Sequence, residues 1–296
     1  MKTIVVAGGT GLIGKRLVEL LRTSGHKVNV LSRNPQQEGE FQWDPREGQI
    51  DEKAIAEASV FVNLSGAGIA DEKWTNNRKS YLQQSRVGTN VFLYGIRDKM
   101  PKLEHFICAS GINAYGFKDA TKEYIESDSY GGDFVSQLVK VWELSAEQFK
   151  TDVKVATVRT AVVLDGKGGA LQKMVPIVKK GIGSALGSGN QMMPWIHAED
   201  LVQMYLHIIE NKLEGPFNAV TDTTSNKEFM KTIAKVLHKP FWFPNVPAFV
   251  MRMMYGEMSI ILLNGVRASN KKILNTGFHF KYNHLEEALN EALATA

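Results

Sequence analysis

Three glycines near the N-terminus, spaced three residues apart, constrain this chain more than any other feature. Gly8, Gly11 and Gly14 directly follow a short β-branched run, Thr3–Ala7, and they open a segment of helical period, Leu12–Ser24. In such a strand–loop–helix unit the first glycine makes a tight turn, the second lets the backbone approach a pyrophosphate, and the third lets helix and strand pack closely. Free amides and the helix dipole then face the phosphates. We expect a nucleotide to lie against Gly8, Thr10, Gly11, Leu12 and Ile13.

The first half of the chain alternates short apolar runs with longer segments of helical period. The expected strands are Thr3–Ala7, Lys27–Leu31, Val60–Asn63, His105–Ala109 and Val155–Arg159. The expected helices are Leu12–Ser24, Glu72–Lys99 (with a possible break) and Asp133–Lys150. Apolar strands that do not alternate with polar residues predict a parallel sheet covered on both faces. The fold class is therefore α/β, a doubly wound parallel sheet of the Rossmann type.

The pattern changes after about Asp165, where glycine-rich loops and a proline-punctuated aromatic stretch begin. This change predicts a nucleotide-binding domain at residues 1–165, to which residues 190–220 return, and a smaller substrate lobe at residues 166–296. The glycine-rich loop Gly181–Asn190 and the apolar residues that follow it resemble a pocket wall, which suggests that a small molecule binds there. Asp200 precedes an apolar-periodic run, so we expect it to be the N-cap of a helix. We expect Met251, Met253, Met254 and Met258 to lie in the core of the lobe rather than in a groove for a partner.

The residues after the second expected strand indicate which dinucleotide binds. An NAD site usually has an acidic residue at this place to hold the ribose hydroxyls. This chain has Ser32 and Arg33 instead. An arginine binds a 2′-phosphate through charge-assisted hydrogen bonds, whereas a carboxylate would repel it. The sequence therefore predicts NADP(H) as the cofactor, with Ser32 and Arg33 at its 2′-phosphate.

The composition argues against several other function classes. The net charge of +4 comes from 35 basic and 31 acidic residues of interleaved sign, so we expect no nucleic-acid partner. Cys108 is the single cysteine, which excludes an intrachain disulfide and a cysteine-based metal site and indicates a buried small hydrophobe. We expect no metal. The apolar stretches are too short or too interrupted to cross a membrane. We therefore expect a soluble, cytoplasmic protein, and the oligomeric state stays open.

Taken together, several motifs resemble those of the extended short-chain dehydrogenase/reductases. The chain is most similar to the NAD-dependent epimerase/dehydratase subgroup that carries a C-terminal domain of unknown function. The resemblance covers essentially the whole chain, and residues 246–296 match the C-terminal domain. Its motifs are the glycine triplet, Asn63–Gly66, Ser85–Asn90, Ala109-Ser110, Tyr115-Gly116, Gly131–Phe134, Trp142-Glu143, Gly187–Gly189, Trp195–Asp200, Gly256-Glu257, Gly265 and Gly277-Phe278.

This resemblance implies a parallel sheet of about seven strands, with the cofactor along the carboxyl ends of the strands and a small substrate lobe above it. It implies that Leu64 and Ser65 pass beneath the cofactor and that Gly66 allows close backbone approach. It also implies that Arg86 approaches the cofactor from the next helix, unless it pairs with a local acid. Ser110 would lie near the nicotinamide.

The family's usual proton-transfer pair, Tyr-x-x-x-Lys, is missing from this chain. In that pair the lysine lowers the pKa of the tyrosine, so the phenol can exchange a proton with a carbonyl or hydroxyl group. Counting back from Glu143, the pair should occupy positions 139 and 135, which are Val139 and Val135 here. The usual serine position is also changed, because it is occupied by Gly111, with Ser110 one place earlier.

Two side chains are candidates to replace the missing pair. Tyr115 is the nearest substitute proton donor, and its alternative role is to pack beneath the cofactor loop. Ser110 can serve if the loop shifts, and its alternative role is that of a strand-end hydroxyl bonded to backbone. His197 beside Asp200 suggests an acid–imidazole pair, although this segment more often anchors a strand to the next helix.

Two functions remain at this point. The first is an NADP(H)-dependent oxidoreductase or epimerase that acts on a small molecule by an atypical mechanism. It would draw its proton from Tyr115, Ser110, water or the substrate. The second is a non-catalytic NADP(H)-binding sensor or scaffold. The intact lobe favours the enzyme, and the missing pair favours the sensor.

Overall fold

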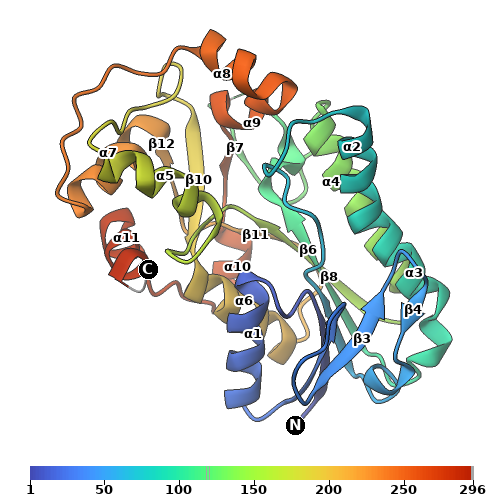
Figure 1. Cartoon of the computed structure of the whole chain (residues 1–296). Helices are drawn as coiled ribbons and strands as arrows, with labels where there is room; N and C mark the ends of the chain where they lie inside the picture. The colour runs from blue at the N-terminus through green and yellow to red at the C-terminus, as the bar shows by residue number, and fades with distance from the viewer. Residues whose placement is uncertain (118, 120, 295–296) are drawn as a thin grey trace.

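The computed structural model describes residues 1–117, 119 and 121–294, and it shows a large twisted sheet with helices on both faces (Figure 1). The sheet order is β11-β8-β6-β5-β1-β2-β3-β4. Its strands are β1 (Thr3–Ala7), β2 (Lys27–Ser32), β3 (Glu40–Asp44), β4 (Gln49–Ile50), β5 (Val60–Asn63), β6 (His105–Gly111), β8 (Lys154–Thr160) and β11 (Gly215–Ala219). Neighbours from β11 to β3 are parallel, and β4 is antiparallel to β3. The predicted Rossmann-type parallel sheet is confirmed; the short β4 adds an antiparallel edge.

Residues of β1 show why the strands are continuous apolar runs. Ile4 and Val6 belong to the core beneath α1 and α6, whereas Val5 and Ala7 belong to the core beneath α3 and α4. Both faces of the sheet are therefore buried, as parallel strands require. Figure 1 shows α1 and α6 together on one side of the sheet. The helices are α1 (Leu12–Thr23), α6 (Ala198–Glu210), α3 (Thr89–Gly95) and α4 (Phe134–Glu147).

A second, smaller sheet lies beyond the carboxyl ends of the large one. Its order is β12-β10-β9, and α5, α7 and α11 pack around it on a core that includes Trp195, Phe229 and Leu289. Its elements are β9 (Val162–Leu164), α5 (Gly169–Lys179), β10 (Met192–His197), β12 (Asp222–Ser225), α7 (Asn226–Val236) and α11 (Leu285–Ala294). Within residues 190–220, β10 joins this small sheet, whereas β11 joins the large one. The division into two domains at residue 165 stays a prediction.

The last 50 residues connect the two sheets. Tyr255, Met258 and Ile261 pack with Trp74 and Leu82. β13 pairs with β7, and α10 contacts β11. The elements of this region are β7 (Glu123–Tyr124), α8 (Ala248–Tyr255), α9 (Ile260–Leu263), β13 (Arg267–Ala268) and α10 (Lys271–Leu274). The C-terminal segment therefore packs on both parts of the molecule and forms no separate lobe.

The possible break in the helical segment expected over Glu72–Lys99 is present, because the segment divides into α2 (Asn76–Gln83), a π-helical turn and α3. Two other local expectations are corrected. Asp200 is not the N-cap of α6, because the helix begins two residues earlier and the ring of His197 accepts the capping hydrogen bond from the Glu199 amide. Of the methionines expected in the core, Met251 and Met258 are buried, but Met253 and Met254 are exposed.

Candidate cofactor and substrate sites

The glycine loop between β1 and α1 is built so tightly that Gly8 and Gly14 leave no room for a side chain. Gly8 has a φ of +79°, and a Cβ atom there would lie 3.0 Å from the backbone of Leu64. A Cβ atom on Gly14 would lie 2.1 Å from the carbonyl oxygen of Gly8. The amide of Gly11 donates to that same oxygen at 3.0 Å, which closes the turn. The spacing of the glycines therefore serves the steric roles expected from the sequence.

The N-terminus of α1 is open to a ligand. Gly11 is the N-cap and offers no side-chain oxygen, and no acidic residue occupies the first turn. The first amides of a helix have no intrahelical partner, and they carry partial positive charge. These two features favour an anion at this end of α1. The loop thus fits a dinucleotide pyrophosphate in its shape and in its charge.

A cavity of about 410 Å³ lies over this loop, at the carboxyl ends of β1, β2 and β5. Its volume falls in the range of small-molecule and cofactor sites. It brings together eight of the residues predicted from the sequence. These are Gly8, Thr10, Gly11, Ser32, Arg33, Leu64, Ser65 and Gly66. Leu12 and Ile13 are half-buried and do not line it. The Leu12 side chain lies over Gly168, and Ile13 packs on the core.

Arg33 lies at one end of the cavity with its side chain exposed. Within the described residues its guanidinium makes no hydrogen bond or ion pair, so its donors are available to a phosphate. The neighbouring Ser32 is buried, and its Oγ accepts a hydrogen bond from the Asn34 amide at 3.2 Å. This bond turns the chain at the end of β2 and leaves the Ser32 hydroxyl hydrogen free to donate.

Sequence reasoning missed a second cation at this cavity. Arg46 lines it beside Asp44 and makes two side-chain hydrogen bonds to that carboxylate, at 3.0 and 3.2 Å. These hydrogen bonds, together with the backbone amide of Arg46, lower the pKa of Asp44. Asp44 is the last residue of β3 and Arg46 follows it, and this strand was not expected from the sequence. The alternation of apolar Phe41 and Trp43 around Gln42 is the signal that could have found it.

The loop after β5 forms another wall of the cavity and is held from behind. The Oδ1 atom of Asn63 accepts hydrogen bonds from the amide and hydroxyl of Ser65. Arg86 donates to the carbonyl oxygen of Ala67 at 2.7 Å and to that of Leu82 at 3.2 Å. Arg86 is buried, does not line the cavity, and has backbone carbonyl groups rather than an acid as partners. Burial lowers its pKa to about 10. It positions the loop that faces the cofactor cavity.

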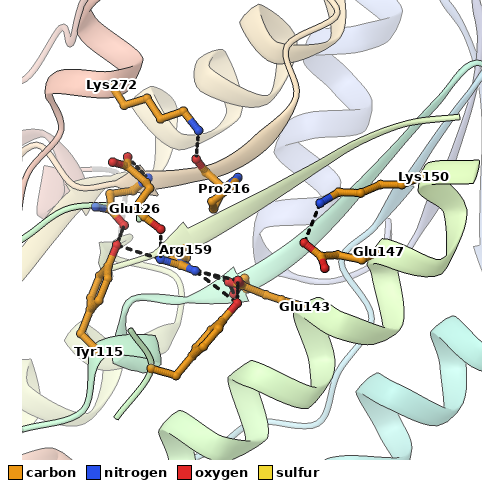
Figure 2. A network of polar contacts seen from close by, with 11 residues as sticks. Tyr115, Glu126, Glu143, Glu147, Lys150, Arg159, Pro216 and Lys272 are labelled. Atoms are coloured by element: carbon orange, nitrogen blue, oxygen red, sulfur yellow. Dashed lines mark hydrogen bonds and ion pairs between the residues drawn. The ribbon is translucent and has the colours of Figure 1, made fainter. Parts of the chain in front are cut away.

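Tyr115 belongs to a buried polar network around Arg159 (Figure 2), and Ser110 joins this network through Glu143. The Oγ atom of Ser110 donates to Glu143 at 2.5 Å, and Arg159 donates to the same carboxylate twice at 2.8 Å. The Tyr115 hydroxyl donates to Asn218 at 2.6 Å and accepts from Arg159 at 3.0 Å. Burial raises the pKa of Tyr115 to about 12, although the Arg159 charge opposes this.

Because Tyr115 and Ser110 are bonded within this network, neither hydroxyl group is free to contact a ligand in this structure. Tyr115 is 2% exposed and its hydroxyl is already bonded on both sides. Ser110 is 5% exposed, and its hydroxyl points to Glu143 on α4. The catalytic roles of Ser110 and Tyr115 stay predictions, and neither side chain lines the cofactor cavity.

The two positions of the missing Tyr-x-x-x-Lys pair hold apolar side chains that pack against their neighbours. Val139 lies 3.5 Å from the position of a Cβ atom on Gly111, at the end of β6. Val135 is buried in the cluster with Trp74 and Met258. Val139 therefore faces the carboxyl end of β6, Val135 packs against the C-terminal segment, and neither side chain can transfer a proton.

A second cavity, of about 80 Å³, lies between the large sheet and the small sheet β12-β10-β9. Its walls come from the segment after β6, from β9, α5 and α7, from the Leu186–Pro194 region, and from Ile261–Val266 of the C-terminal segment. Gly265 is required here, because a Cβ atom would lie 2.2 Å from the Met192 amide nitrogen. The pocket wall expected from the sequence therefore does line a cavity.

His197 is not paired with Asp200. Its Nε2 atom lies 3.0 Å from a carboxylate oxygen of Glu291 on α11. The Asp200 carboxylate accepts the amides of Lys281 and Tyr282. These contacts fix the junction of β10 and α6 to the C-terminal segment.

In the described part of the chain, no helix is both long and apolar enough to cross a bilayer.

Protein-family models match most of this chain. Residues 4–220 match the model of the NAD dependent epimerase/dehydratase family, and residues 246–292 match a domain of unknown function, DUF1731. The chain belongs to the NAD-dependent epimerase/dehydratase family. This confirms the resemblance inferred from the sequence, including its C-terminal part.

Members of this family resemble the chain over its whole length. The epimerase family protein YfhF of Bacillus subtilis is 34% identical and is aligned over 98% of each chain. The human epimerase family protein SDR39U1, solved with NADPH, is 31% identical with a TM-score of 0.89, covering 99% of this chain and all of that one. Its cofactor is the one predicted here from Ser32 and Arg33. UDP-glucose 4-epimerase of Thermus thermophilus, solved with NAD, shares the fold at 18% identity and a TM-score of 0.76, over 99% of each chain.

Proposed function

We propose that this chain is an NADPH-dependent oxidoreductase that acts on a small molecule held in the cavity between the sheet and the lobe. The observation that carries the proposal is the placement of the two cavities. The first opens at the carboxyl ends of β1, β2 and β5, and the second begins directly after β6. Ligands of open α/β sheets bind at these strand ends. The NADPH in the human family member supports the choice of cofactor.

Different residues around the first cavity would bind different parts of the cofactor. The glycine loop and the first amides of α1 would hold the pyrophosphate, and Arg33 and Ser32 would hold the 2′-phosphate. Leu64 to Gly66 would pass beneath the cofactor, with Arg86 supporting that loop from behind. NADPH supplies a hydride when bound. The chain would orient it so that its nicotinamide end meets the substrate cavity near Gly111.

The proton source decides between reduction and epimerisation. The side chains that line the second cavity are apolar or are amides, and none of them titrates near neutral pH. Epimerisation through an oxidised substrate needs a base to take the hydroxyl proton first. A net reduction needs one proton, which water or the substrate can supply. The lining therefore favours a reductase over an epimerase.

Because this lining has no general acid, it is also compatible with a second function, that of a non-catalytic NADPH sensor. A missing general acid typically lowers a rate by about 10² to 10⁴-fold. One experiment separates the two functions. The purified chain is saturated with NADPH, and small neutral carbonyl compounds are screened by the loss of NADPH absorbance. We expect slow oxidation of NADPH by some of them, with stoichiometric product. NADPH binding without any turnover across the screen would favour the sensor.

A further inference from the structure

Two neighbouring strands bring charged side chains to the same end of the cofactor cavity. β2 and β3 are parallel and pair Ser32 with Gln42, so both strands end at the same edge of the sheet. The Gln42 side chain donates to the Arg33 carbonyl oxygen at 3.1 Å, which ties the chain after β2 to β3. Among the described residues, Arg33, Asp44 and Arg46 are the only charged ones that line this cavity. These three side chains therefore set its net charge.

Arg46 lines the cavity with part of its guanidinium unbonded. Asp44 accepts the backbone amide of Arg46 at 3.0 Å, its Nε atom at 3.2 Å and its Nη2 atom at 3.0 Å. These three bonds fix the side chain of Arg46 beside the end of β3. Its Nη1 atom has no hydrogen-bond partner in the described part of the chain, and the side chain is 48% exposed. Arg46 therefore keeps donor hydrogens for a ligand.

Asp44 lies close enough to both arginines for their charges to act on its carboxylate. The hydrogen bonds from Arg46 lower the pKa of Asp44, and the charge of Arg33 lowers it further. Asp44 is therefore ionised at neutral pH, and the three side chains carry two positive charges and one negative charge, a net charge of +1. A phosphate monoester such as the 2′-phosphate of NADPH carries a charge of about −2. If either arginine were absent, the other would form a neutral pair with Asp44.

We propose that Arg46 is a second specificity-determining residue for NADPH, and that Arg33 and Arg46 together bind the 2′-phosphate against the opposing charge of Asp44. This inference rests on the proposed function in taking the cavity as the NADPH site. Because Asp44 cancels the charge of one arginine, both arginines are needed for the cofactor preference. Without them Asp44 would stand alone, like the acid that holds the ribose hydroxyls in an NAD site.

The affinities of the full chain for NADPH and NADH test this arrangement, because the two cofactors differ only in the 2′-phosphate. We would measure them by calorimetric titration at low ionic strength, where charges are screened least. In Arg46→Ala, as in Arg33→Ala, we expect the dissociation constant of NADPH to rise about tenfold and that of NADH to stay nearly constant. The double variant should bind NADH more tightly than NADPH, by about threefold. Arg252→Ala removes an exposed arginine of α8 that does not line the cavity, and it should keep the wild-type ratio.

An unchanged ratio of the two affinities in Arg46→Ala would overturn the inference. An equal loss of both affinities would also overturn it, because a contact with the adenine or the pyrophosphate would weaken NADPH and NADH alike. A double variant that still prefers NADPH is the third contradicting result. These measurements need no turnover, so a reductase screen without activity leaves the inference standing. Turnover that uses NADPH and NADH equally well would overturn the inference and leave the reductase activity in place.

Discussion

The guanidinium of Arg159 lies against the carboxylate of Glu143 in a place where the two side chains are only 3% and 4% exposed. This ion pair joins β8 to α4 and also holds the hydroxyl groups of Ser110 and Tyr130. Burial opposes the charge on Arg159, but its hydrogen bonds to Glu143 and the charge of that carboxylate outweigh burial, and the net pKa of Arg159 is raised. The network therefore keeps Arg159 charged and fixes the end of β6.

Glu143→Gln should destabilise the fold severely. It leaves the Arg159 charge buried without its counterion, and breaking one side of a buried pair typically costs about 3–5 kcal/mol. Urea unfolding measures the loss. The double variant Glu143→Leu with Arg159→Leu removes both charges and should lose less stability than the single one. A single variant that unfolds at the wild-type urea concentration would contradict this account.

Tyr115→Phe distinguishes a structural tyrosine from a catalytic one. The variant removes a hydrogen bond to Asn218 and one from Arg159, and we expect the free energy of unfolding to fall by about 1–2 kcal/mol. Any NADPH-dependent turnover should change by less than about threefold, because the hydroxyl is buried away from both cavities. A loss of about 10²-fold or more, with the fold intact, would instead identify Tyr115 as the proton donor.

Gly14→Ala should distort the glycine loop and weaken NADPH binding. Its Cβ atom would lie 2.1 Å from the Gly8 carbonyl oxygen, and overpacking of this kind costs about 1–3 kcal/mol. The matched control is Gly95→Ala, where nothing lies within 4 Å of the new Cβ atom. The control should bind NADPH normally and be at least as stable as the wild type. Fluorescence titration and thermal melting test both variants.

Arg33→Ala should remove the preference for NADPH over NADH. We expect the dissociation constant of NADPH to rise about tenfold, a change of about 1.4 kcal/mol, and that of NADH to stay nearly constant. Calorimetric titration of both cofactors provides the measurement. Lys53→Ala, an exposed cation away from the cavity, controls for overall charge. An unchanged ratio of the two affinities in Arg33→Ala would mean that another group reads the 2′-phosphate.

The buried side chain of His105 should make the free energy of unfolding decrease as the pH falls below about 6.5. Burial lowers its pKa from 6.5 to about 4, so it stays neutral in the folded chain while the unfolded chain takes up a proton. Its destabilising effect begins near pH 6.5, grows as the pH falls, and is complete below about pH 4. The expected total is roughly 3 kcal/mol. His105→Gln should show a flatter stability profile between these pH values in urea titrations, and identical profiles would refute the assignment.

The sequence predicted the fold where a local rule acts alone. The bounds of Thr3–Ala7 and Val60–Asn63 are confirmed because continuous apolar runs are specific for buried parallel strands. The sequence rules failed where tertiary contacts decide. Three of the five residues of β3 are polar, so its pattern was too weak to predict a strand, and Arg46 was missed with it. Asp200 has the right residue type for a helix cap, but the C-terminal segment supplies it with the Lys281 and Tyr282 amides.

The candidate site divides in the same way. The glycine loop, Ser32 and Arg33 could be found because they stand in fixed positions relative to two consecutive strands. The contacts of Gln191 at the second cavity could not be predicted, since its amide donates to two carbonyl groups, one of them at Leu262, more than 70 positions later in the chain. The position of Tyr115 in the sequence indicated a reactive residue. Its burial beside Arg159 became visible only when β8 was placed against the turn after β6.

The two cavities are lined by different parts of the chain. All residues that line the first cavity lie between Gly8 and Thr89, whereas those that line the second cavity are spread from Ile112 to Val266. Under the proposed function, substitutions in the later part of the chain would therefore alter which small molecule binds without changing the residues around the dinucleotide. Evolution or protein engineering could then change the substrate while the protein keeps NADPH as its cofactor.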